Sequence, residues 1–475
     1  MDKKPNLLFL YTDEQAFNTL ACYGNDWIEM PNLNALAEQS VVFDRAYVTQ
    51  PVCTPSRSTL MTGQWPHTNG CVRNNVPLQP ATKCLPELLP EGEYVTGHYG
   101  KWHLGDEIFR QHGFDEWANY EDNYVAYYGP GRDRSERSAY HHYLLEQGYM
   151  PDSEDRNLFS RGFCCRLPEE HGKPAWIARR AVDFIERHRD ETFALFVNFL
   201  EPHMPFFGPR DEQYDPETIS LPHNHEALPD ESFPAKYVEK SSRKVPEAYP
   251  GSERTETNWR TLRARYYGLC SLVDTHAGRI LDALEQNGLW DNTIIVFTSD
   301  HGDMMGAHGQ TGKGVMYEEA VRVPLLIKMP GQKQMKRIRG CVSHIDVLPT
   351  ILDLMGNGVR DDLQGGSLRP VMESNNPRVT DDVFIEWNNA APDGQTEPKN
   401  PGEENDERAI ITADGWKFVW SREGRHILFD LNEDPGETTN LYGRPEYAVR
   451  VDDLLERIRS WQQRVDDRPS LQSFV

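Results

Sequence analysis

The chain has 475 residues, enough for a large hydrophobic core and more than a single core usually organises, so we expect one large and one smaller domain. Its 50 Lys and Arg against 74 Asp and Glu give a formal net charge of −24, which argues against nucleic acid and anionic membranes as partners. An anionic substrate would need positively charged residues gathered around its binding site.

The cysteines show no C-x-x-C pair and no regular spacing, so neither a zinc ribbon nor a disulfide framework is indicated. We expect most of them to be reduced and structural, including the adjacent Cys164 and Cys165. The start M-D-K-K-P-N lacks the apolar segment of a signal peptide, and no run of about 18 apolar residues predicts a membrane span. Two locations stay open: the cytoplasm, or the periplasm or exterior after removal of a signal peptide. The oligomeric state also stays open.

The first apolar run, N-L-L-F-L-Y at residues 6–11, leads into Thr12, Asp13 and Glu14, as a buried parallel strand leads into polar residues at its carboxyl end. Helical periodicity follows from Pro31, and V-V-F-D-R-A-Y-V reads as the next strand. The pattern of a strand followed by polar residues recurs at 193–203 and 293–302, with an amphipathic helix at about 261–287 between them. This alternation predicts an α/β sheet that binds ligands beyond the carboxyl ends of its strands.

Two segments, 120–175 and 205–255, are rich in Pro, Tyr, Arg, Asp and Glu and have weak periodicity. We expect long loops there, suited to substrate selection. After residue 375, short strands alternate with turn residues, and a last helix is expected at about 447–466. The predicted domains are therefore 1–375, which would be catalytic, and 376–475, a small antiparallel α+β domain.

The stretch V-C-T-P-S-R-S-T-L-M-T-G at 52–63 places Cys53 in a turn just before a predicted helix and four residues before Arg57. A lone cysteine is often a small buried hydrophobe. A thiol at a helix start beside a guanidinium also suits a nucleophile or a residue that is chemically modified. The rest of the chain has to separate these interpretations.

Two strand ends carry acids that suit a hard divalent cation. Asp13 and Glu14 follow the first strand, and Asp300 and His301 follow a later one. Carboxylate oxygens with one imidazole can bind calcium, magnesium or manganese. Either pair alone could be a solvated sheet edge, whereas the two pairs together favour a metal site.

Basic residues occur in three further motifs. G-K-W-H-L-G places Lys101 and His103 on the same side of an expected extended segment, since side chains repeat every two residues there. T-G-K-G holds Lys313, and E-P-H-M-P-F holds His203 next to prolines. Each alone would be an ordinary surface or core residue. Together with Arg57 they predict a pocket for a tetrahedral anion.

These motifs in this order resemble the type I, formylglycine-dependent sulfatases of the alkaline phosphatase superfamily, in which the cysteine of C-x-P-S-R is oxidised to an aldehyde. The resemblance covers nearly the whole chain and rests on C-T-P-S-R-S-T-L-M-T-G, G-K-W-H-L-G, E-P-H-M-P-F, S-D-H-G-D-M-M-G with G-K-G, R-V-P-L-L-I-K-M-P-G and L-F-D-L-N-E-D-P-G-E-T-T-N-L. It implies an alkaline-phosphatase-like α/β fold, with a mixed sheet between helices. It also implies a formylglycine-generating enzyme or a radical maturase as the partner that converts Cys53.

The resemblance assigns a role to each matching residue. The implied metal ligands are Asp13, Glu14, Asp300, His301 and the modified Cys53. Arg57, Lys101 and His103 would position the formylglycine hydrate, and Lys101 would also touch sulfate. His203 and Lys313 would face the oxygen of the leaving group.

The metal implied first is Ca²⁺, with Mn²⁺ or Mg²⁺ as alternatives. Glu14 stands where the family usually has aspartate, and His301 where many members have asparagine. A longer carboxylate and an imidazole could shift the preference towards Mn²⁺.

The chemistry also explains why a cysteine would be converted. A hydrated aldehyde has two hydroxyls: one attacks sulfur, and deprotonation of the second, assigned to His103, expels sulfate by C–O cleavage. Fixed cations and a metal stabilise the charge that develops on the sulfate oxygens. Protonation of the departing oxygen is assigned to His203, assisted by Lys313.

We therefore predict a sulfuric ester hydrolase acting on a sulfated carbohydrate, since long polar and aromatic insertions suit saccharides. The alternatives are a choline or aryl sulfatase, a phosphonate monoester or phosphodiester hydrolase, and a binding protein that keeps its thiol. His308 is expected in loop packing or near the metal ligands, and His67, Arg73, Asn74 and Asn75 either contact substrate or have ordinary loop roles.

Overall fold

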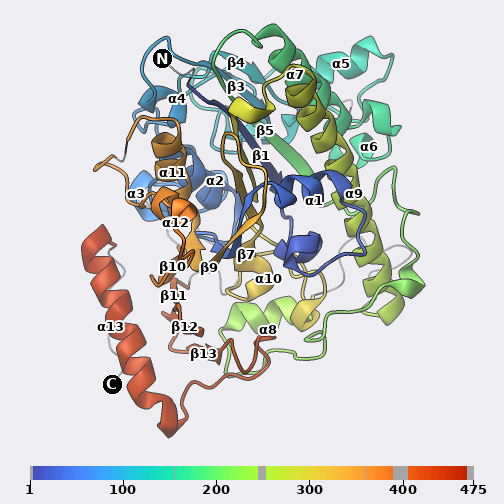
Figure 1. Ribbon diagram of the computed structural model, residues 1–475. Coiled ribbons are helices and arrows are strands. Elements are labelled where there is room, and N and C mark those ends of the chain that lie inside the picture. The colour runs from blue at the N-terminus through green and yellow to red at the C-terminus, as the bar shows by residue number, and fades with distance from the viewer. Residues whose placement is uncertain (1–3, 154–155, 244–252, 359, 389–404, 468–475) are drawn as a thin grey trace.

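The computed structural model describes residues 4–153, 156–243, 253–358, 360–388 and 405–467. A mixed sheet lies at its centre, with strands in the order β4-β3-β5-β1-β6-β8-β2-β7 and with β9 paired to β2 (Figure 1). Its strands are β1 (Asn6–Asp13), β2 (Val41–Tyr47), β3 (Val95–Gly100), β4 (Glu116–Ala118), β5 (Phe193–Pro202), β6 (Thr293–Ser299), β7 (Arg322–Val323), β8 (Leu325–Lys328) and β9 (Lys336–Ser343).

Four neighbouring strands, β3, β5, β1 and β6, run parallel. Residues of β1, β5 and β6 are buried along their whole lengths, because helices cover both faces of the sheet. The carboxyl ends of the four strands therefore meet at one edge. The predicted mixed sheet flanked by helices is confirmed.

Alternate residues of β1 pack into two different cores. Leu8 and Leu10 join the core that includes Trp176 and Ile280, from α7 (Lys173–Arg187) and α9 (Glu256–Gln286). Leu7 and Phe9 join the opposite core, with side chains from α2 (Cys53–Thr62) and α11 (Val347–Leu354). The period of two along a strand thus supplies both faces. The other helices are α1 (Pro31–Glu38), α3 (Pro66–Asn69), α4 (Leu85–Leu88), α5 (Ala139–Glu146), α6 (Arg161–Cys164), α8 (Ala235–Ser242), α10 (Glu318–Val321), α12 (Arg369–Glu373) and α13 (Ala448–Val465).

A separate four-stranded antiparallel sheet follows near the C-terminus, as predicted. It consists of β10 (Val383–Trp387), β11 (Glu407–Ile411), β12 (Trp416–Ser421) and β13 (Ile427–Asp430). Leu454, Ile458 and Trp461 of α13 share one hydrophobic core with this sheet. Trp65 and Ile345 also belong to that core, so the small sheet packs on the larger part of the chain. The domain boundary at residue 375 stays a prediction.

The segment 120–175, expected as loops, contains short helices. The side chains of Ser138 and Ser160 accept hydrogen bonds from His141 N and Phe163 N, both 3.1 Å, and these caps start α5 and α6. The other expected loop segment contains α8, and residues 244–252 of it lie outside the described residues. Among the helices of the described ranges, none combines the length and the apolar character that a membrane crossing needs.

Candidate active site

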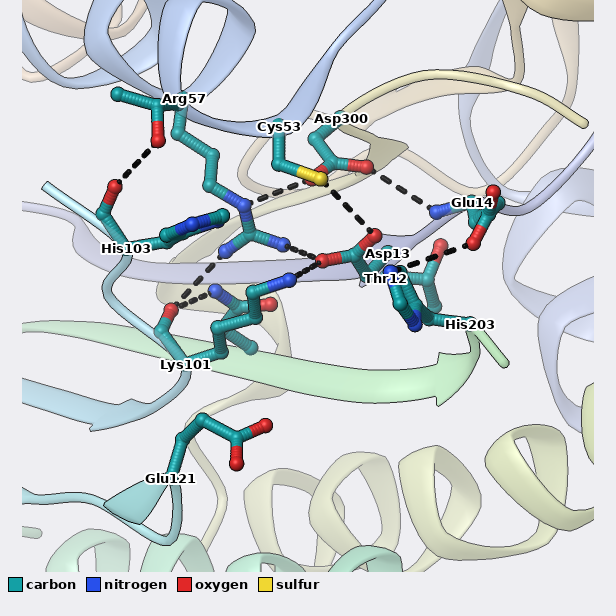
Figure 2. Close-up of polar contacts among 12 residues, drawn as sticks. Thr12, Asp13, Glu14, Cys53, Arg57, Lys101, His103, Glu121, His203 and Asp300 are labelled. Carbon is teal, nitrogen blue, oxygen red and sulfur yellow. Dashed lines mark hydrogen bonds and ion pairs between the residues drawn. The ribbon is translucent and has the colours of Figure 1, made fainter. Parts of the chain in front are cut away.

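Acidic residues meet at the carboxyl ends of β1 and β6. Asp13 is the last residue of β1, and Asp300 and His301 follow β6 directly. His301 Nε2 lies 3.8 Å from Asp13 Oδ1 and 3.6 Å from Asp300 Oδ1. Glu14 has a left-handed backbone with φ 72°, and its N–H donates to Asp300 Oδ1 at 3.1 Å. The two acid-bearing strand ends thus form one buried cluster (Figure 2).

Cys53 is the first residue of α2 and lies against this cluster rather than in the hydrophobic cores. Its Sγ is 3.2 Å from His301 Nε2. The same sulfur lies 3.8 Å from Asp13 Oδ1 (Figure 2). Burial and the Asp13 carboxylate oppose ionisation of the thiol, but Lys101, Lys313 and His301 outweigh them and lower its pKa. The surroundings of Cys53 are therefore polar and charged.

The donor atoms of this cluster suit a divalent cation. One ligand atom from each of Asp13, Cys53, Asp300 and His301 lies within 4.8 Å of the others, and Asp13 forms a second such group with Glu14 and His203. Glu14 Oε2 is buried and has no hydrogen-bond partner in the described part of the chain. The set is mainly hard carboxylate oxygen, which calcium, magnesium and manganese prefer.

His301 is oriented for such a role. Its Nδ1 lies 2.9 Å from Gly302 O, so Nδ1–H donates to that carbonyl and Nε2 faces the acids. Burial disfavours the imidazolium, but Asp300 and Cys53 outweigh burial and raise the pKa of His301 to about 9. A cation bound at Nε2 would replace this proton, since a ligating imidazole is neutral.

Arg57 connects the acids to Lys101. Its Nε donates to Asp300 Oδ2 and its Nη2 to Asp13 Oδ2, both at 2.7 Å, while Nη1 donates to Lys101 O at 3.0 Å. The Lys101 ammonium also contacts Asp13 Oδ2. Burial opposes the charge of Lys101, but Asp13 outweighs it and raises the lysine pKa, so the ammonium stays charged. The arginine and the lysine therefore fix the Asp13 carboxylate from one side.

His103 reaches the site by a route that differs from the expected one. β3 ends at Gly100, and His103 has φ 59°, so the segment is not extended and its side chains do not alternate. Glu107 explains this bend, because its carboxylate accepts the N–H groups of Trp102 at 2.7 Å and His103 at 2.6 Å. Thr54, next to Cys53, donates its hydroxyl to His103 O at 2.8 Å.

His203 and Lys313 meet around Glu14. His203 Nε2 lies 3.5 Å from Glu14 Oε2, and Lys313 Nζ lies 2.8 Å from Glu14 Oε1. Burial, followed by the Lys313 charge, holds the pKa of His203 well below its usual range. Burial raises the pKa of Glu14 to about 7, although Lys313 opposes that shift. All residues predicted for the site thus lie in one region, and their catalytic and ligand roles stay predictions.

The sequence reasoning missed three residues, one that contacts His103 and two behind it. Tyr124 stacks on its ring, with centroids 4.2 Å apart, and Glu121 and Arg161 bond each other next to Tyr124. They come from the 120–175 insertion, and no local motif marks them. Asn75, for which the sequence allowed either substrate contact or an ordinary loop role, also contacts this histidine. Its Oδ1 lies 2.9 Å from His103 Nε2.

Asn74, His67 and His308, three of the other residues left open, make contacts within the protein. Asn74 Oδ1 accepts Thr54 N–H at 3.0 Å, and His67 pairs with Glu386 of the small sheet at 2.6 Å. His308 stacks on Tyr317 with centroids 3.8 Å apart, in loop packing. None of the eight cysteines, Cys164 and Cys165 included, forms a disulfide bond.

The mixed sheet, with acids, a cysteine and cations gathered at the carboxyl ends of its parallel strands, is that of the alkaline phosphatase superfamily. Within that superfamily the chain belongs to the sulfatase family, because the family model described as Sulfatase matches residues 5–357. A second model, described as N-sulphoglucosamine sulphohydrolase, C-terminal, matches residues 306–464. The prediction of a sulfatase is confirmed.

The chain is 28% identical to the N-acetylglucosamine-6-O-sulfatase of Bacteroides thetaiotaomicron over 505 residues, covering 98% of this chain and 87% of the relative. One solved structure, of a protein in complex with its substrate D-glucosamine-2-N,6-O-disulfate, has a TM-score of 0.77 at 23% identity, covering 99% of this chain and 100% of that one. The phosphonate monoester hydrolase of Silicibacter pomeroyi also has a TM-score of 0.77, at 24% identity and with 99% and 98% covered. These two structures show the fold alone.

Proposed function

We propose that this sulfatase releases inorganic sulfate from a sulfated carbohydrate, using a formylglycine made from Cys53 and one divalent cation. The observation that carries the proposal is the place of Cys53, at the first residue of α2 and 3.2 Å from His301 Nε2. The carbohydrate substrate is supported by the relative named an N-acetylglucosamine-6-O-sulfatase and by the match to the N-sulphoglucosamine sulphohydrolase C-terminal model.

The cation would be held by Asp13, Glu14, Asp300, His301 and the converted Cys53, with Ca²⁺ as the first choice and Mn²⁺ or Mg²⁺ as alternatives. A hydroxyl of the hydrated formylglycine would attack sulfur, and a cation held by these residues would supply positive charge for the sulfate oxygens.

On the side of the acids, Arg57 and Lys101 orient Asp13 and supply positive charge to the sulfate oxygens. His103 Nε2–H donates to Asn75 Oδ1, so Nδ1 is the nitrogen that can accept a proton. This Nδ1 is buried and has no hydrogen-bond partner among the described residues. This leaves His103 suited to take the proton of the second formylglycine hydroxyl.

On the opposite side, His203 Nδ1–H donates to Met204 O at 2.7 Å, which leaves Nε2 to hold the proton for the departing sugar oxygen. Burial and Lys313 lower the pKa of His203, and a sulfate anion bound beside it would favour the protonated imidazolium that the acid role needs. The Lys313 pKa is raised, so its ammonium stays charged and assists at the same oxygen.

The test is sulfate release, measured by ion chromatography, from sulfated saccharides, choline sulfate and an aryl sulfate, with a phosphodiester and a phosphonate monoester beside them. Cys53→Ala serves as the inactive control. Release from a saccharide that is lost in the control is the expected result. Turnover of the phosphodiester or phosphonate alone would instead establish the alternative hydrolase, and turnover restricted to choline or aryl sulfate would make the enzyme a small-molecule sulfatase.

The modification is tested separately on protein from its native host. The tryptic peptide Ala46–Arg57 should have the mass of the aldehyde at position 53. A peptide that contains only the thiol would contradict the formylglycine mechanism and favour a binding protein.

A further inference from the structure

A buried charged group from the 120–175 insertion lies next to the catalytic histidine. Arg161, the first residue of α6, donates from Nε to Glu121 Oε2 at 2.8 Å and from Nη2 to the Tyr124 hydroxyl at 2.9 Å. Glu121 is fully buried, whereas 21% of the Arg161 side chain is exposed. The guanidinium is therefore held in place, on a side chain that is partly exposed to solvent.

This group is connected directly to the proposed catalytic residues. The Tyr124 ring stacks on His103, with centroids 4.2 Å apart and planes at 22°. The Lys101 ammonium lies 5.8 Å from the centroid of the same ring. The Arg161 charge also contributes to the lowered pKa values of His103 and His203, after burial and nearer cations. Arg161 thus lies one aromatic ring away from the atoms that would bind and cleave the sulfate ester.

Arg161 retains both charge and a donor for a ligand. Burial raises the pKa of Glu121, but Arg161 and Lys173 outweigh it and lower that pKa to about 2, so one carboxylate faces two cations. The neighbouring Glu201 has its pKa raised to about 7 by burial and adds only a partial charge at neutral pH. Within the described ranges, Arg161 Nη1 has no hydrogen-bond partner.

We propose that Arg161 is a specificity-determining residue that binds a second anionic group, a carboxylate or a further sulfate, on the saccharide whose sulfate ester is cleaved. The inference rests on the proposed function and names its substrate class as doubly charged saccharides. A fixed guanidinium with a free edge binds such groups through charge-assisted hydrogen bonds, and a chain with a net charge of −24 needs this local positive charge to hold a second anion.

The experiment measures binding by titration calorimetry in the Cys53→Ala background, so that it does not depend on turnover. Two pairs of probes differ by one charge: D-glucosamine-2-N,6-O-disulfate against N-acetylglucosamine 6-sulfate, and a 2-O-sulfated glucuronate against its methyl ester. We expect the doubly charged member of at least one pair to bind about 10- to 100-fold more tightly, and Arg161→Gln to remove that preference. The probe pair that shows this preference identifies the second anionic group as a sulfate or as a carboxylate.

Arg166→Gln is the matched control, since Arg166 is an exposed arginine of the same segment and donates Nη1 to Gly162 O at 3.0 Å. It should leave the preference unchanged. Arg161→Lys keeps the charge without the planar fork and should reduce the preference about 3- to 10-fold, which decides the matter if the glutamine variant does not fold.

Three results would each overturn the inference: no preference in either pair, a preference that survives Arg161→Gln, or equal weakening of both members of a pair. Equal weakening would mean that Arg161 acts only through Tyr124 and His103. Failure of the proposed function would appear in a different measurement, as a lack of sulfate release by the unmutated enzyme. The ratios of binding affinity in the Cys53→Ala background could still be interpreted.

Discussion

The replacement His203→Ala tests how the leaving group departs. His203 Nδ1–H donates to Met204 O at 2.7 Å, so only Nε2 is left to protonate the sugar oxygen. A sugar alcohol leaves poorly without a proton, and general acid catalysis contributes about 10²- to 10⁴-fold, or about 3–5 kcal/mol of the barrier. We expect a loss of that size in kcat on a saccharide sulfate. An activated aryl sulfate needs little protonation and should lose less than about 10-fold.

The assay is kcat and kcat/KM on a sulfated saccharide and on a series of aryl sulfates with leaving groups of different pKa. The exposed His142 supplies the control, because His142→Ala removes an imidazole on α5 without touching the site. Metal content is measured in each variant, since His203 also lies 3.5 Å from Glu14. Equal losses on the saccharide and on the most activated aryl sulfate would remove His203 from the role of general acid.

Three further outcomes are expected. Asn75→Gly removes the amide that contacts His103 Nε2, and glycine tolerates the backbone φ of 65° at this position. We expect kcat to fall about 10-fold. An unchanged kcat and pH profile would show that the 2.9 Å contact does not position the histidine. Burial lowers the pKa of His67, but Glu386 outweighs burial and raises the pKa above its usual value. The ion pair therefore stabilises the fold fully below the unfolded-state pKa of about 6.5. This stabilisation is lost as the pH rises through the higher folded-state pKa. The difference in thermal midpoint between the wild type and His67→Gln should therefore shrink from pH 6 to pH 9, and a constant difference would contradict this sign. Exhaustive chelation should abolish sulfate release, with recovery on adding Ca²⁺ or Mn²⁺; full activity in the chelated protein would rule out the metal.

The strand ends could be predicted because the signal is local. An apolar run followed by acids identifies a buried parallel strand and its carboxyl end. Asp13 and Asp300 lie where that pattern places them, at the carboxyl ends of the adjacent strands β1 and β6. The hairpins of the small sheet were predictable for the same reason, since short β-rich runs alternate with turn residues.

The contacts around His103 could not be predicted in this way. Its backbone conformation depends on Glu107, and its ring orientation depends on Asn75 and Tyr124, which are 28 and 21 residues away in sequence. Arg161 is further still, and its pairing with Glu121 requires the insertion to fold back on the sheet edge. Side-chain contacts between separate segments leave no period in the sequence, so they emerge only from the fold.

The charge balance of the site explains how so acidic a chain can bind an anion. The cations Arg57, Lys101 and Lys313 are each paired with a carboxylate of Asp13, Glu14 or Asp300, so the charges of these six groups largely offset one another. The His301 imidazolium adds one positive charge, which a bound metal would replace. Ion pairs whose charges offset each other fix the positions of these side chains, but they attract a sulfate ester only weakly against the negative field of the whole protein. A divalent cation in the proposed site would leave a net positive charge where the sulfate has to bind. On this argument the fixed residues provide orientation, and a metal in the proposed site would provide much of the attraction.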